Sequence, residues 1–436
     1  MNFVTSYTYN AIDKLTQAVL TRPEGTQQRT FVWNGRDLMS ETNPENGTTS
    51  YTYNGVHEVT SRTDAKGQQT QYSYDSYNRL TEVRHLSISG QLQEDPSQRW
   101  DYYYDTNTID TSFPAQNTWG RLTAVQFQPE GTFNYYGAGL GQMTYEYSYN
   151  PAGRVTTQRL QLANAATAHL DATYAWDNEG RVTSLAYPLS GPTYAYAFDA
   201  MGRLSTMTEN GSQMAVAGYN WADQMTSLTY DAFSETRTYD PLRMQLTRIP
   251  TTRLGSSVMD MSYGYTPGKN NGQISQSVDG VSGETVNYTY DALKRLATAQ
   301  AANNSWGNAY SYDGFGNLTA ATVTAGSAPH FSIGANPATN GVPGTPYDAN
   351  GNPWASVYQY DVENRIINQY DGTGTRTYDP SGKRVAQWDG TNGTRLNFDG
   401  IAGQRLGTYT LSSRGAGFST SSLNLYFGSK LIRSRA

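Results

Sequence analysis

The sequence predicts an all-β fold built from repeated antiparallel β-hairpins. Three observations support this class: a short turn motif recurs along the chain, tyrosines alternate with other residues before it, and glycine is abundant. The 436 residues include 35 Tyr and 42 Gly, and hydrophobic residues make up 37% of the chain. The apolar side chains are therefore largely aromatic and suited to strands. No segment has the periodicity of an amphipathic helix, so we expect no helix longer than one or two turns.

The recurring motif, called the turn tag below, has a fixed order of residue types. It reads aromatic, Asp or Asn, two variable residues, a residue able to adopt positive φ, an Arg-like residue and an aliphatic residue. Copies begin at Tyr9, Tyr53, Tyr74, Tyr149, Trp176, Phe198, Tyr290, Tyr312 and Tyr360. In the centre, aromatic residues at positions 176, 198, 219 and 239 lie 22, 21 and 20 residues apart. A fixed period in this range indicates repeated supersecondary units.

The residues around each tag have the pattern of β-strands. Before one tag, tyrosines occupy every second position, at Tyr145, Tyr147 and Tyr149. This period of two places the rings on one face of a strand. After the tags come short runs such as residues 203–206, which are again typical of strands. Each repeat is therefore expected to be a hairpin of strand, tag and strand, stabilised mainly by its neighbours.

The tag itself predicts the turn and the register of the hairpin. In the copy that begins at Phe198, the Asp199 side chain can accept a hydrogen bond from the backbone two residues further on. Gly202 takes the left-handed position of a type I turn followed by a bulge. Phe198 then lies opposite Leu204 on one face, and Asp199 and Arg203 lie on the other. Aromatic–aliphatic pairs of this kind contribute about 0.2–1 kcal/mol each.

The other copies are expected to use the same positions in the same structural role. These positions are Tyr74 and Asp75; Tyr149, Gly153 and Arg154; Trp176, Asp177, Gly180 and Arg181; Tyr290 and Asp291; Tyr312, Asp313 and Gly316; and Tyr360 and Asp361. We expect positive φ at Gly153, Gly180, Gly202 and Gly316. His57 and Lys294 occupy the same slot and are expected to form the more strained turns.

Residues 1–436 are expected to form one continuous repeat array, because no stretch resembles an interdomain linker. The period is interrupted at residues 85–120 and at residues 247–275, which hold a degenerate unit. Residues 325–346 are rich in Gly and Pro and are expected to form an irregular insertion. Both ends read as repeat strands, so we expect a segment of a longer protein: an open, curved wall with unpaired sheet edges that associates with other chains.

Composition excludes several classes of function. The net charge is −6 with both signs mixed along the chain, which gives no support to nucleic-acid binding through a basic face. The absence of cysteine excludes disulfides, thiolate metal sites and cysteine nucleophiles. No apolar run is long enough to span a bilayer.

A search for chemistry yields no catalytic, cofactor-binding or metal-binding residue. Four scattered histidines lack metal or triad spacing and are expected to be solvated: His57, His85, His169 and His330. The glycines of residues 137–141 lack the βαβ context of a phosphate loop. Residues 348–352 offer oxygen ligands but lack the further acidic residues of a calcium loop, so a repeat turn is the better interpretation. The recurring Asp177, Asp199 and Asp240 are interpreted as structural, with arginines between them.

The Tyr-Asp tag at this spacing resembles the YD repeat of the RHS proteins. These include bacterial polymorphic toxins, the B and C components of insecticidal toxin complexes, and the extracellular region of teneurins. The resemblance covers nearly the whole chain and implies a ribbon-like β-sheet that spirals into a hollow shell. In the family the shell encloses a cargo, usually a C-terminal toxin domain released by an aspartyl autoprotease. Residues 422–436 resemble the strand pair that leads into the core-associated region of the family, which is missing here.

The chain departs from the family at the cleavage motif. The family has two Asp-Pro-x-Gly elements, whereas this chain has one, Asp379 to Gly382, inside a turn tag that begins at Tyr378. A proline at the second position of a turn is the simpler interpretation, and we expect no autoproteolysis.

The resemblance implies a non-catalytic shell segment of a secreted or cell-surface RHS toxin protein, without a cofactor. Its expected partner is the enclosed toxin domain of the same longer polypeptide. The alternative is a cell-surface adhesion or carbohydrate-binding array that recognises glycans through exposed rings. A downstream core-associated region and toxin domain would support the first function. Wall-anchoring or lectin-like modules would support the second.

Overall fold

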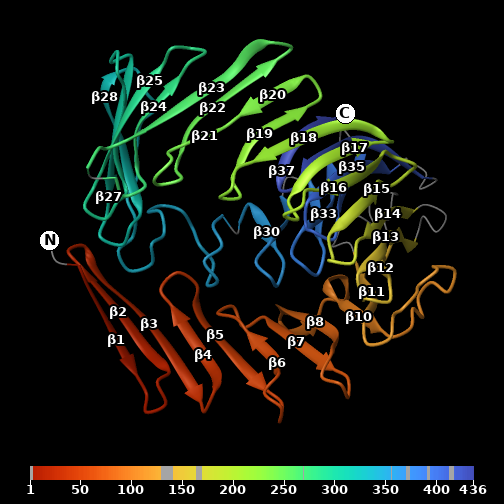
Figure 1. The fold of residues 1–436 in the computed structure, drawn as a ribbon. Helices are drawn as coiled ribbons and strands as arrows, with labels where there is room; N and C mark the ends of the chain where they lie inside the picture. The colour runs from red at the N-terminus through yellow and green to blue at the C-terminus, as the bar shows by residue number, and fades with distance from the viewer. Residues whose placement is uncertain are drawn as a thin grey trace. The chain divides into compact units, whose positions relative to one another are not determined.

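The computed structural model describes residues 3–128, 141–163, 169–268, 270–354, 356–369, 374–389, 393–411 and 417–436. Among these residues, the elements with both ends described are β-strands and a three-residue 3₁₀ helix, Pro96–Gln98 (Figure 1). The predicted all-β class is confirmed. In the part of the chain that the structure describes, no helix is long and apolar enough to cross a membrane.

Among the described residues, the first 29 strands belong to one sheet. Its first strands are β1 (Val4–Tyr9), β2 (Leu15–Arg22), β3 (Gly25–Asn34), β4 (Asp37–Asn43), β5 (Gly47–Tyr53), β6 (Val59–Thr63), β7 (Gln69–Tyr74), β8 (Leu80–Ser89), β9 (Gln91–Glu94), β10 (Trp100–Tyr104), β11 (Leu122–Phe127), β12 (Met143–Tyr149), β13 (Val155–Leu162), β14 (His169–Trp176) and β15 (Val182–Ala186).

The same sheet continues along the chain. The strands are β16 (Thr193–Phe198), β17 (Leu204–Glu209), β18 (Ser212–Tyr219), β19 (Met225–Tyr230), β20 (Phe233–Thr236), β21 (Thr238–Tyr239), β22 (Leu246–Arg253), β23 (Ser256–Tyr265), β24 (Ile274–Asp279), β25 (Thr285–Tyr290), β26 (Leu296–Ala301), β27 (Trp306–Tyr312), β28 (Leu318–Gly326) and β29 (Phe331–Ser332).

Two smaller sheets follow. A two-stranded sheet contains β30 (Tyr358–Tyr360) and β31 (Ile366–Gln369). A six-stranded sheet contains β32 (Thr375–Tyr378), β33 (Arg384–Asp389), β34 (Gly393–Asp399), β35 (Arg405–Leu411), β36 (Phe418–Phe427) and β37 (Lys430–Arg435). The strand pair expected near residues 422–436 is therefore present as the antiparallel pair β36–β37.

Neighbouring strands pair antiparallel, with the register that the turn tag predicts. Tyr74 lies opposite Leu80, and Tyr149 lies opposite Val155. In each case the register shifts by one residue next to the tag aromatic, at a β-bulge. The bulge follows from the extra left-handed residue in the turn.

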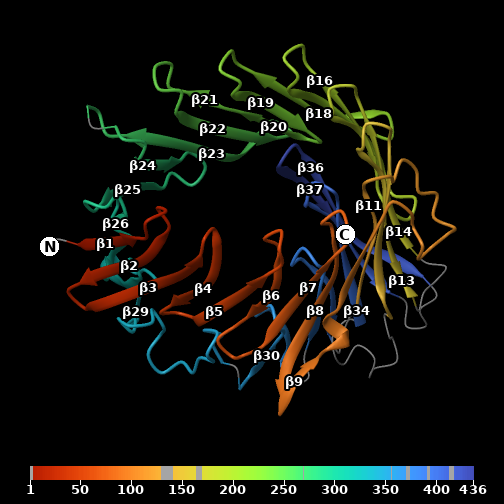
Figure 2. The same cartoon turned by 90° about the horizontal axis from the view of Figure 1, so that it is seen from below.

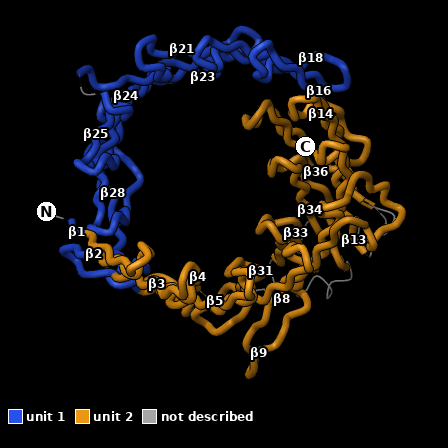
Figure 3. The backbone as a smooth tube through the Cα atoms, turned by 60° about the horizontal axis from the view of Figure 1, so that its bottom comes forward, with its two compact units in different colours: residues 1–4, 20–27, 195–343 blue, residues 5–19, 28–194, 344–436 orange. Residues whose placement is uncertain are grey.

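The chain divides into two compact units (Figure 3). One comprises residues 1–4, 20–27 and 195–343, and the other comprises residues 5–19, 28–194 and 344–436. Each is described by itself below.

The unit that contains residues 195–343 is a series of antiparallel hairpins. The turn between β2 and β3 belongs to it: Arg22 Nε donates to the carbonyl oxygen of Gly314 at 2.8 Å. Gln27 Nε2 donates to the carbonyl oxygen of Pro337 at 3.1 Å. Residues 325–346, where an irregular insertion is expected, contain only the end of β28 and the two-residue β29 as strand.

The other unit contains the larger hydrophobic core. Its six-stranded sheet lies beside the strands β11–β15 (Figures 1 and 2). The Tyr187 hydroxyl donates to the carbonyl oxygen of Asn424 at 2.7 Å, and Gln158 Nε2 donates to that of Asp399 at 3.1 Å. Fully buried large side chains on these strands are Phe127, Met143, Leu160, Leu162, Leu170, Leu396, Phe398 and Tyr409.

Residues 344–369 of this unit lie against the hairpins of β4 to β8. Lys66 Nζ lies 3.2 Å from Asp348 Oδ2, and the backbone N–H of Val362 donates to Gln98 Oε1 at 3.0 Å. These contacts join residues more than 250 positions apart, and the repeat pattern of the sequence does not predict them.

Candidate functional site

The turn tags form a closed network of backbone and side-chain hydrogen bonds. In the tag at Asp75, the backbone N–H of Asp75 donates to the carbonyl of Arg79, and that of Asn78 donates to the carbonyl of Asp75, both at 3.0 Å. Asp75 Oδ1 accepts from the backbone N–H groups of Tyr77 at 2.8 Å and Arg79 at 2.9 Å. Asp or Asn suits this position because its side chain accepts from the backbone N–H groups of the turn.

The fifth tag position has the predicted left-handed conformation. Gly153, Gly180, Gly202 and Gly316 have φ of +80°, +88°, +80° and +98°. His57 and Lys294 adopt the same conformation, with φ of +70° and +65°. An added Cβ at Gly180 would lie 2.6 Å from Arg154 Nη2, so the glycine also makes room for the arginine of the preceding tag.

Asp and Arg of the same tag form the expected ion pairs. The Oδ2 to Nε distances are 2.7 Å for Asp75–Arg79, 2.6 Å for Asp177–Arg181, 2.7 Å for Asp291–Arg295 and 2.5 Å for Asp361–Arg365. Asp199 and Arg203 are likewise 2.8 Å apart. The hydrogen bond from Arg203 lowers the pKa of the Asp199 carboxyl. Burial raises the pKa of the Asp361 carboxyl, although Arg365 opposes this effect.

The tag aromatics make a contact that the sequence analysis missed. The Tyr hydroxyl or the Trp indole N–H donates to a backbone carbonyl of the preceding repeat. In most tags this carbonyl belongs to the aliphatic residue that ends the preceding tag. Donor and acceptor pairs, 2.6 to 2.9 Å apart, are Tyr74–Val59, Tyr149–Leu122, Trp176–Val155, Tyr219–Leu204, Tyr239–Met225, Tyr290–Ile274, Tyr312–Leu296 and Tyr378–Ile366. The sequence does contain a signal for these hydrogen bonds: the aromatic position of nearly every tag is Tyr or Trp, whose side chains carry a hydrogen-bond donor.

The tag arginine makes the complementary contact with the following repeat. Arg203 lies over the Tyr219 ring at 4.8 Å, and Arg295 lies over the Tyr312 ring at 4.4 Å. Arg154 Nη1 also donates to the carbonyl oxygen of Asp177 at 2.9 Å. Cation–π contacts of this kind contribute about 0.5–1 kcal/mol at exposed sites. Most tags are therefore bonded to the preceding repeat through the aromatic side chain and to the following repeat through the arginine.

One segment expected to be degenerate behaves as a regular repeat. Tyr265 lies opposite Ile274, and its hydroxyl donates to the carbonyl oxygen of Leu246 at 2.8 Å. The unit around Tyr263 and Tyr265 differs from the other repeats in its longer turn, and this turn leaves the strand register unchanged.

Asp348 forms a repeat turn, as interpreted from the sequence. Its backbone N–H donates to the carbonyl of Asn352 at 3.0 Å, and its Oδ1 accepts from the backbone N–H of Asn350. The described residues contain no group of three or more side chains suited to a metal ion. Of the glycine-rich stretch 137–141, residues 137–140 lie outside the described residues.

The histidines differ in their surroundings. His85 is fully buried, so the expectation of a solvated side chain is wrong for it. Its Nε2 lies 3.0 Å from Glu363 Oε1, and Arg62 Nη2 lies 2.8 Å from the same oxygen. Burial alone would raise the pKa of Glu363, but the hydrogen bond with His85 and the charge of Arg62 lower it to about 2. The network fixes residues 344–369 to the hairpin strands.

The remaining histidines have no such burial. His57 Nδ1 lies 2.8 Å from Asp37 Oδ2 and the side chain is 44% exposed. His169 is half-buried beside Asp171, and His330 is exposed.

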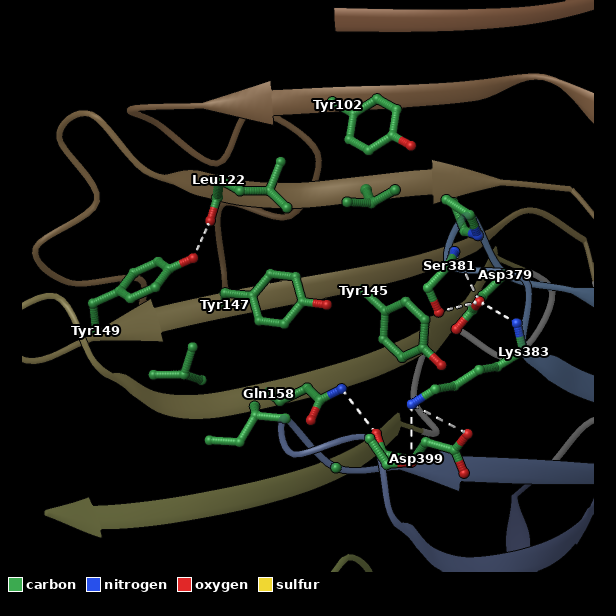
Figure 4. Close-up of a pocket in the computed structure, with 16 residues that line it drawn as sticks. Tyr102, Leu122, Tyr145, Tyr147, Tyr149, Gln158, Asp379, Ser381, Lys383 and Asp399 are labelled. Atoms are coloured by element: carbon green, nitrogen blue, oxygen red, sulfur yellow. Dashed lines mark hydrogen bonds and ion pairs between the residues drawn. The ribbon is translucent and has the colours of Figure 1, made fainter. Parts of the chain in front are cut away.

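A pocket of about 520 Å³ lies between the strands β10–β13 and two turns of the six-stranded sheet (Figure 4). Residues that line it include Tyr102, Tyr145, Tyr147, Tyr149, Gln158, Asp379, Ser381, Lys383 and Asp399. Figure 4 shows the Tyr145 side chain directed from its strand toward the turn that contains Asp379 and Lys383. This juxtaposition joins parts of the chain more than 200 residues apart, so no local sequence signal predicts it.

Asp379 occupies the turn position that the sequence predicts. Its Oδ1 accepts from the backbone N–H groups of Ser381 at 3.0 Å and Lys383 at 2.9 Å. Burial raises the pKa of the Asp379 carboxyl. The plain interpretation of Asp-Pro-x-Gly as a repeat turn therefore agrees with the geometry.

Asp399 is a pocket residue that the sequence analysis missed. It lies opposite Arg405 in the β34–β35 hairpin, at the position where other tags have their aromatic ring. Arg405 Nε lies 3.2 Å from Asp399 Oδ1, and Lys383 Nζ lies 3.8 Å from Asp399 Oδ2. A carboxylate in place of a ring leaves space beside the tyrosines.

Comparisons with known proteins place the repeat in a family. The family model of the RHS repeat matches residues 53–85 and 176–213, which include the tags at Tyr53, Tyr74, Trp176 and Phe198. These two segments of the chain are therefore similar to the RHS repeat. No curated protein sequence matches it.

Solved structures share the fold of this chain. The Tc holotoxin pore of Photorhabdus luminescens is 13% identical, covers 97% of the chain and has a TM-score of 0.67. TcdB2–TccC3 without its hypervariable C-terminal region is 15% identical, covers 98% and has a TM-score of 0.68. The chain spans 27% and 26% of the length of these two proteins. At such low identity the likeness shows the fold alone.

Proposed function

We propose that this RHS-repeat chain is a wall segment of a secreted toxin protein and encloses a toxin domain of the same longer polypeptide. The observation that carries the proposal is the shared fold with TcdB2–TccC3 over 98% of the chain. The chain supplies structure and no catalysis. The adhesion or glycan-binding alternative has no specific observation in its favour.

The chemistry of the tags supports a structural role. In most tags the aromatic side chain bonds to the repeat before it and the arginine contacts the repeat after it, as Tyr219 and Arg203 do. A sheet stabilised between neighbouring hairpins does not need a central hydrophobic core. Such a sheet can surround a space instead of filling it.

The experiment is limited proteolysis of the longer polypeptide that contains this chain and its downstream domain. The downstream domain should resist a broad-specificity protease until denaturant unfolds the repeats. The isolated downstream domain serves as the control. Cleavage of the domain at the same rate in both forms would reject encapsulation.

A further inference from the structure

Three tyrosine hydroxyls in the pocket have no internal acceptor. Tyr149 donates to the carbonyl oxygen of Leu122 at 2.6 Å. For Tyr102, Tyr145 and Tyr147, which line the same pocket, no described residue accepts a hydrogen bond from the hydroxyl. Burial raises the pKa of all three hydroxyls, so they remain donors at physiological pH.

The Tyr145 ring in the pocket packs against two other rings. Tyr145 stacks on Phe127 with centroids 5.7 Å apart and on Tyr147 with centroids 6.5 Å apart. Only 6% of Tyr145 is exposed. A sugar ring therefore finds no free face of Tyr145 on which to stack. The part of Tyr145 that points into the pocket is its hydroxyl (Figure 4).

The charged groups at the opposite wall are already paired. Lys383 Nζ donates to the carbonyl oxygen of Gly403 at 3.0 Å and lies near Asp399, which also pairs with Arg405. Asp379 Oδ1 accepts from the turn, whereas no described residue donates to its Oδ2. The pocket therefore offers three neutral donors and one free acceptor to a ligand.

The tyrosines of the turn tags show an acceptor that recurs in this chain. Their hydroxyls donate to main-chain carbonyls, as Tyr74 does to Val59 and Tyr290 to Ile274, whereas the hydroxyls of Tyr51, Tyr103 and Tyr174 donate to side-chain oxygens. A peptide group also carries an N–H, which fits the free oxygen of Asp379. The volume of about 520 Å³ falls within the range of ligand pockets, about 300–1,000 Å³.

We propose that this pocket binds an extended polypeptide segment through its main chain. Carbonyl groups of the segment accept from the hydroxyls of Tyr102, Tyr145 and Tyr147, and one of its N–H groups donates to Asp379 Oδ2. The proposal rests on the proposed function, because an enclosed domain supplies the polypeptide.

The test uses the 436-residue chain and a fluorescein-labelled, N-acetylated and C-amidated octapeptide of glycine and serine, with binding followed by fluorescence anisotropy. Each of Tyr102→Phe, Tyr145→Phe and Tyr147→Phe should weaken binding roughly 2- to 10-fold, since each removes one neutral hydrogen bond. The thermal midpoint should stay unchanged because no internal hydrogen bond is lost. A version of the peptide with ester links, whose carbonyls are weaker acceptors, should bind less tightly.

The matched control is Tyr219→Phe, in the other unit. This change removes the hydrogen bond to Leu204, so it should lower the thermal midpoint and leave peptide binding unchanged. Equal peptide affinity of the triple phenylalanine variant and the unmodified chain would overturn the proposal. Displacement of the peptide by maltohexaose would overturn it in favour of a sugar site. Neither result affects encapsulation, which proteolysis of the longer polypeptide tests separately.

Discussion

Within a turn tag, the aromatic residue has two roles at once. Its ring packs beside the strand of the same hairpin, and its polar atom reaches the hairpin before it. Tyr312, for example, lies opposite Leu318 and donates to the carbonyl oxygen of Leu296 at 2.9 Å. Tyr and Trp meet both demands, which accounts for the scarcity of Phe at this position.

Removal of one such hydroxyl should therefore cost stability although the ring is retained. Tyr290→Phe removes the donor to the carbonyl oxygen of Ile274, and the free energy of unfolding should fall by about 0.5–1.5 kcal/mol. Urea denaturation measures the change. In Tyr7→Phe, where the side chain is 58% exposed, the change should stay below about 0.5 kcal/mol. Equal losses in the two variants would contradict this role of the hydroxyl.

The left-handed glycines predict a graded response to alanine. Gly180→Ala introduces strain at φ of +88° and places a Cβ 2.6 Å from Arg154 Nη2. Arg154 must then leave the carbonyl of Asp177, so the loss should exceed the ~1 kcal/mol expected from backbone strain alone. At Gly316, φ is +98° and an added Cβ would have no atom within 4 Å, so Gly316→Ala should lose only the stability that backbone strain costs. Thermal unfolding of both variants checks this order, and a larger loss for Gly316→Ala would contradict it.

At the scale of the element, the hairpins are predictable because each turn tag encodes its own turn. The Asp or Asn side chain, the left-handed residue and the cross-strand pair all lie within seven residues, as from Tyr149 to Val155. The strands of the central repeats follow directly from this local chemistry. The degenerate repeat at Tyr265 shows the limit, because its longer turn obscures the tag in the sequence although the strand register is intact.

Contacts between distant segments could not be predicted in the same way. Glu363 occupies a variable tag position, yet it accepts from Arg62 and lies beside buried His85. Asp399 reaches the pocket only because the six-stranded sheet lies against β11–β15. Both contacts depend on how the sheets pack, and the repeat pattern carries no information about that packing.

The Glu363 network predicts a dependence of stability on pH. The folded-state pKa of Glu363 is lowered from 4.5 to about 2, so its contribution to stability is fully present above pH 4.5. The contribution is lost as the pH falls through about 2. Glu363→Gln should be less stable than the unmodified chain at pH 7, and the difference should shrink between pH 4.5 and 2. Urea denaturation across this range measures the difference, and a constant difference would contradict the assignment.

At the scale of the whole molecule, stability is distributed over many similar contacts between hairpins.

The two carboxylates of the pocket have partners in the same structural network: Asp379 accepts from Ser381 and Lys383, and Asp399 pairs with Arg405. Neither carboxylate is held in place by the other. This arrangement agrees with the proposed structural role, in which both carboxylates stabilise turns.

Purified chain should accordingly keep its intact mass. Mass spectrometry over several days at pH 5 and pH 7 should show no defined fragment for the unmodified chain, Asp379→Asn or Asp399→Asn. A fragment that forms in the unmodified chain and disappears in either variant would assign the pocket to proteolysis.

The central claim, that the repeats enclose a toxin domain, is tested most directly by electron cryo-microscopy of the longer polypeptide. The account predicts density for the downstream domain within the wall formed by the repeats, with polypeptide density in contact with Tyr102, Tyr145 and Tyr147. Density for that domain on the outside of the wall, with the pocket facing solvent, would contradict it.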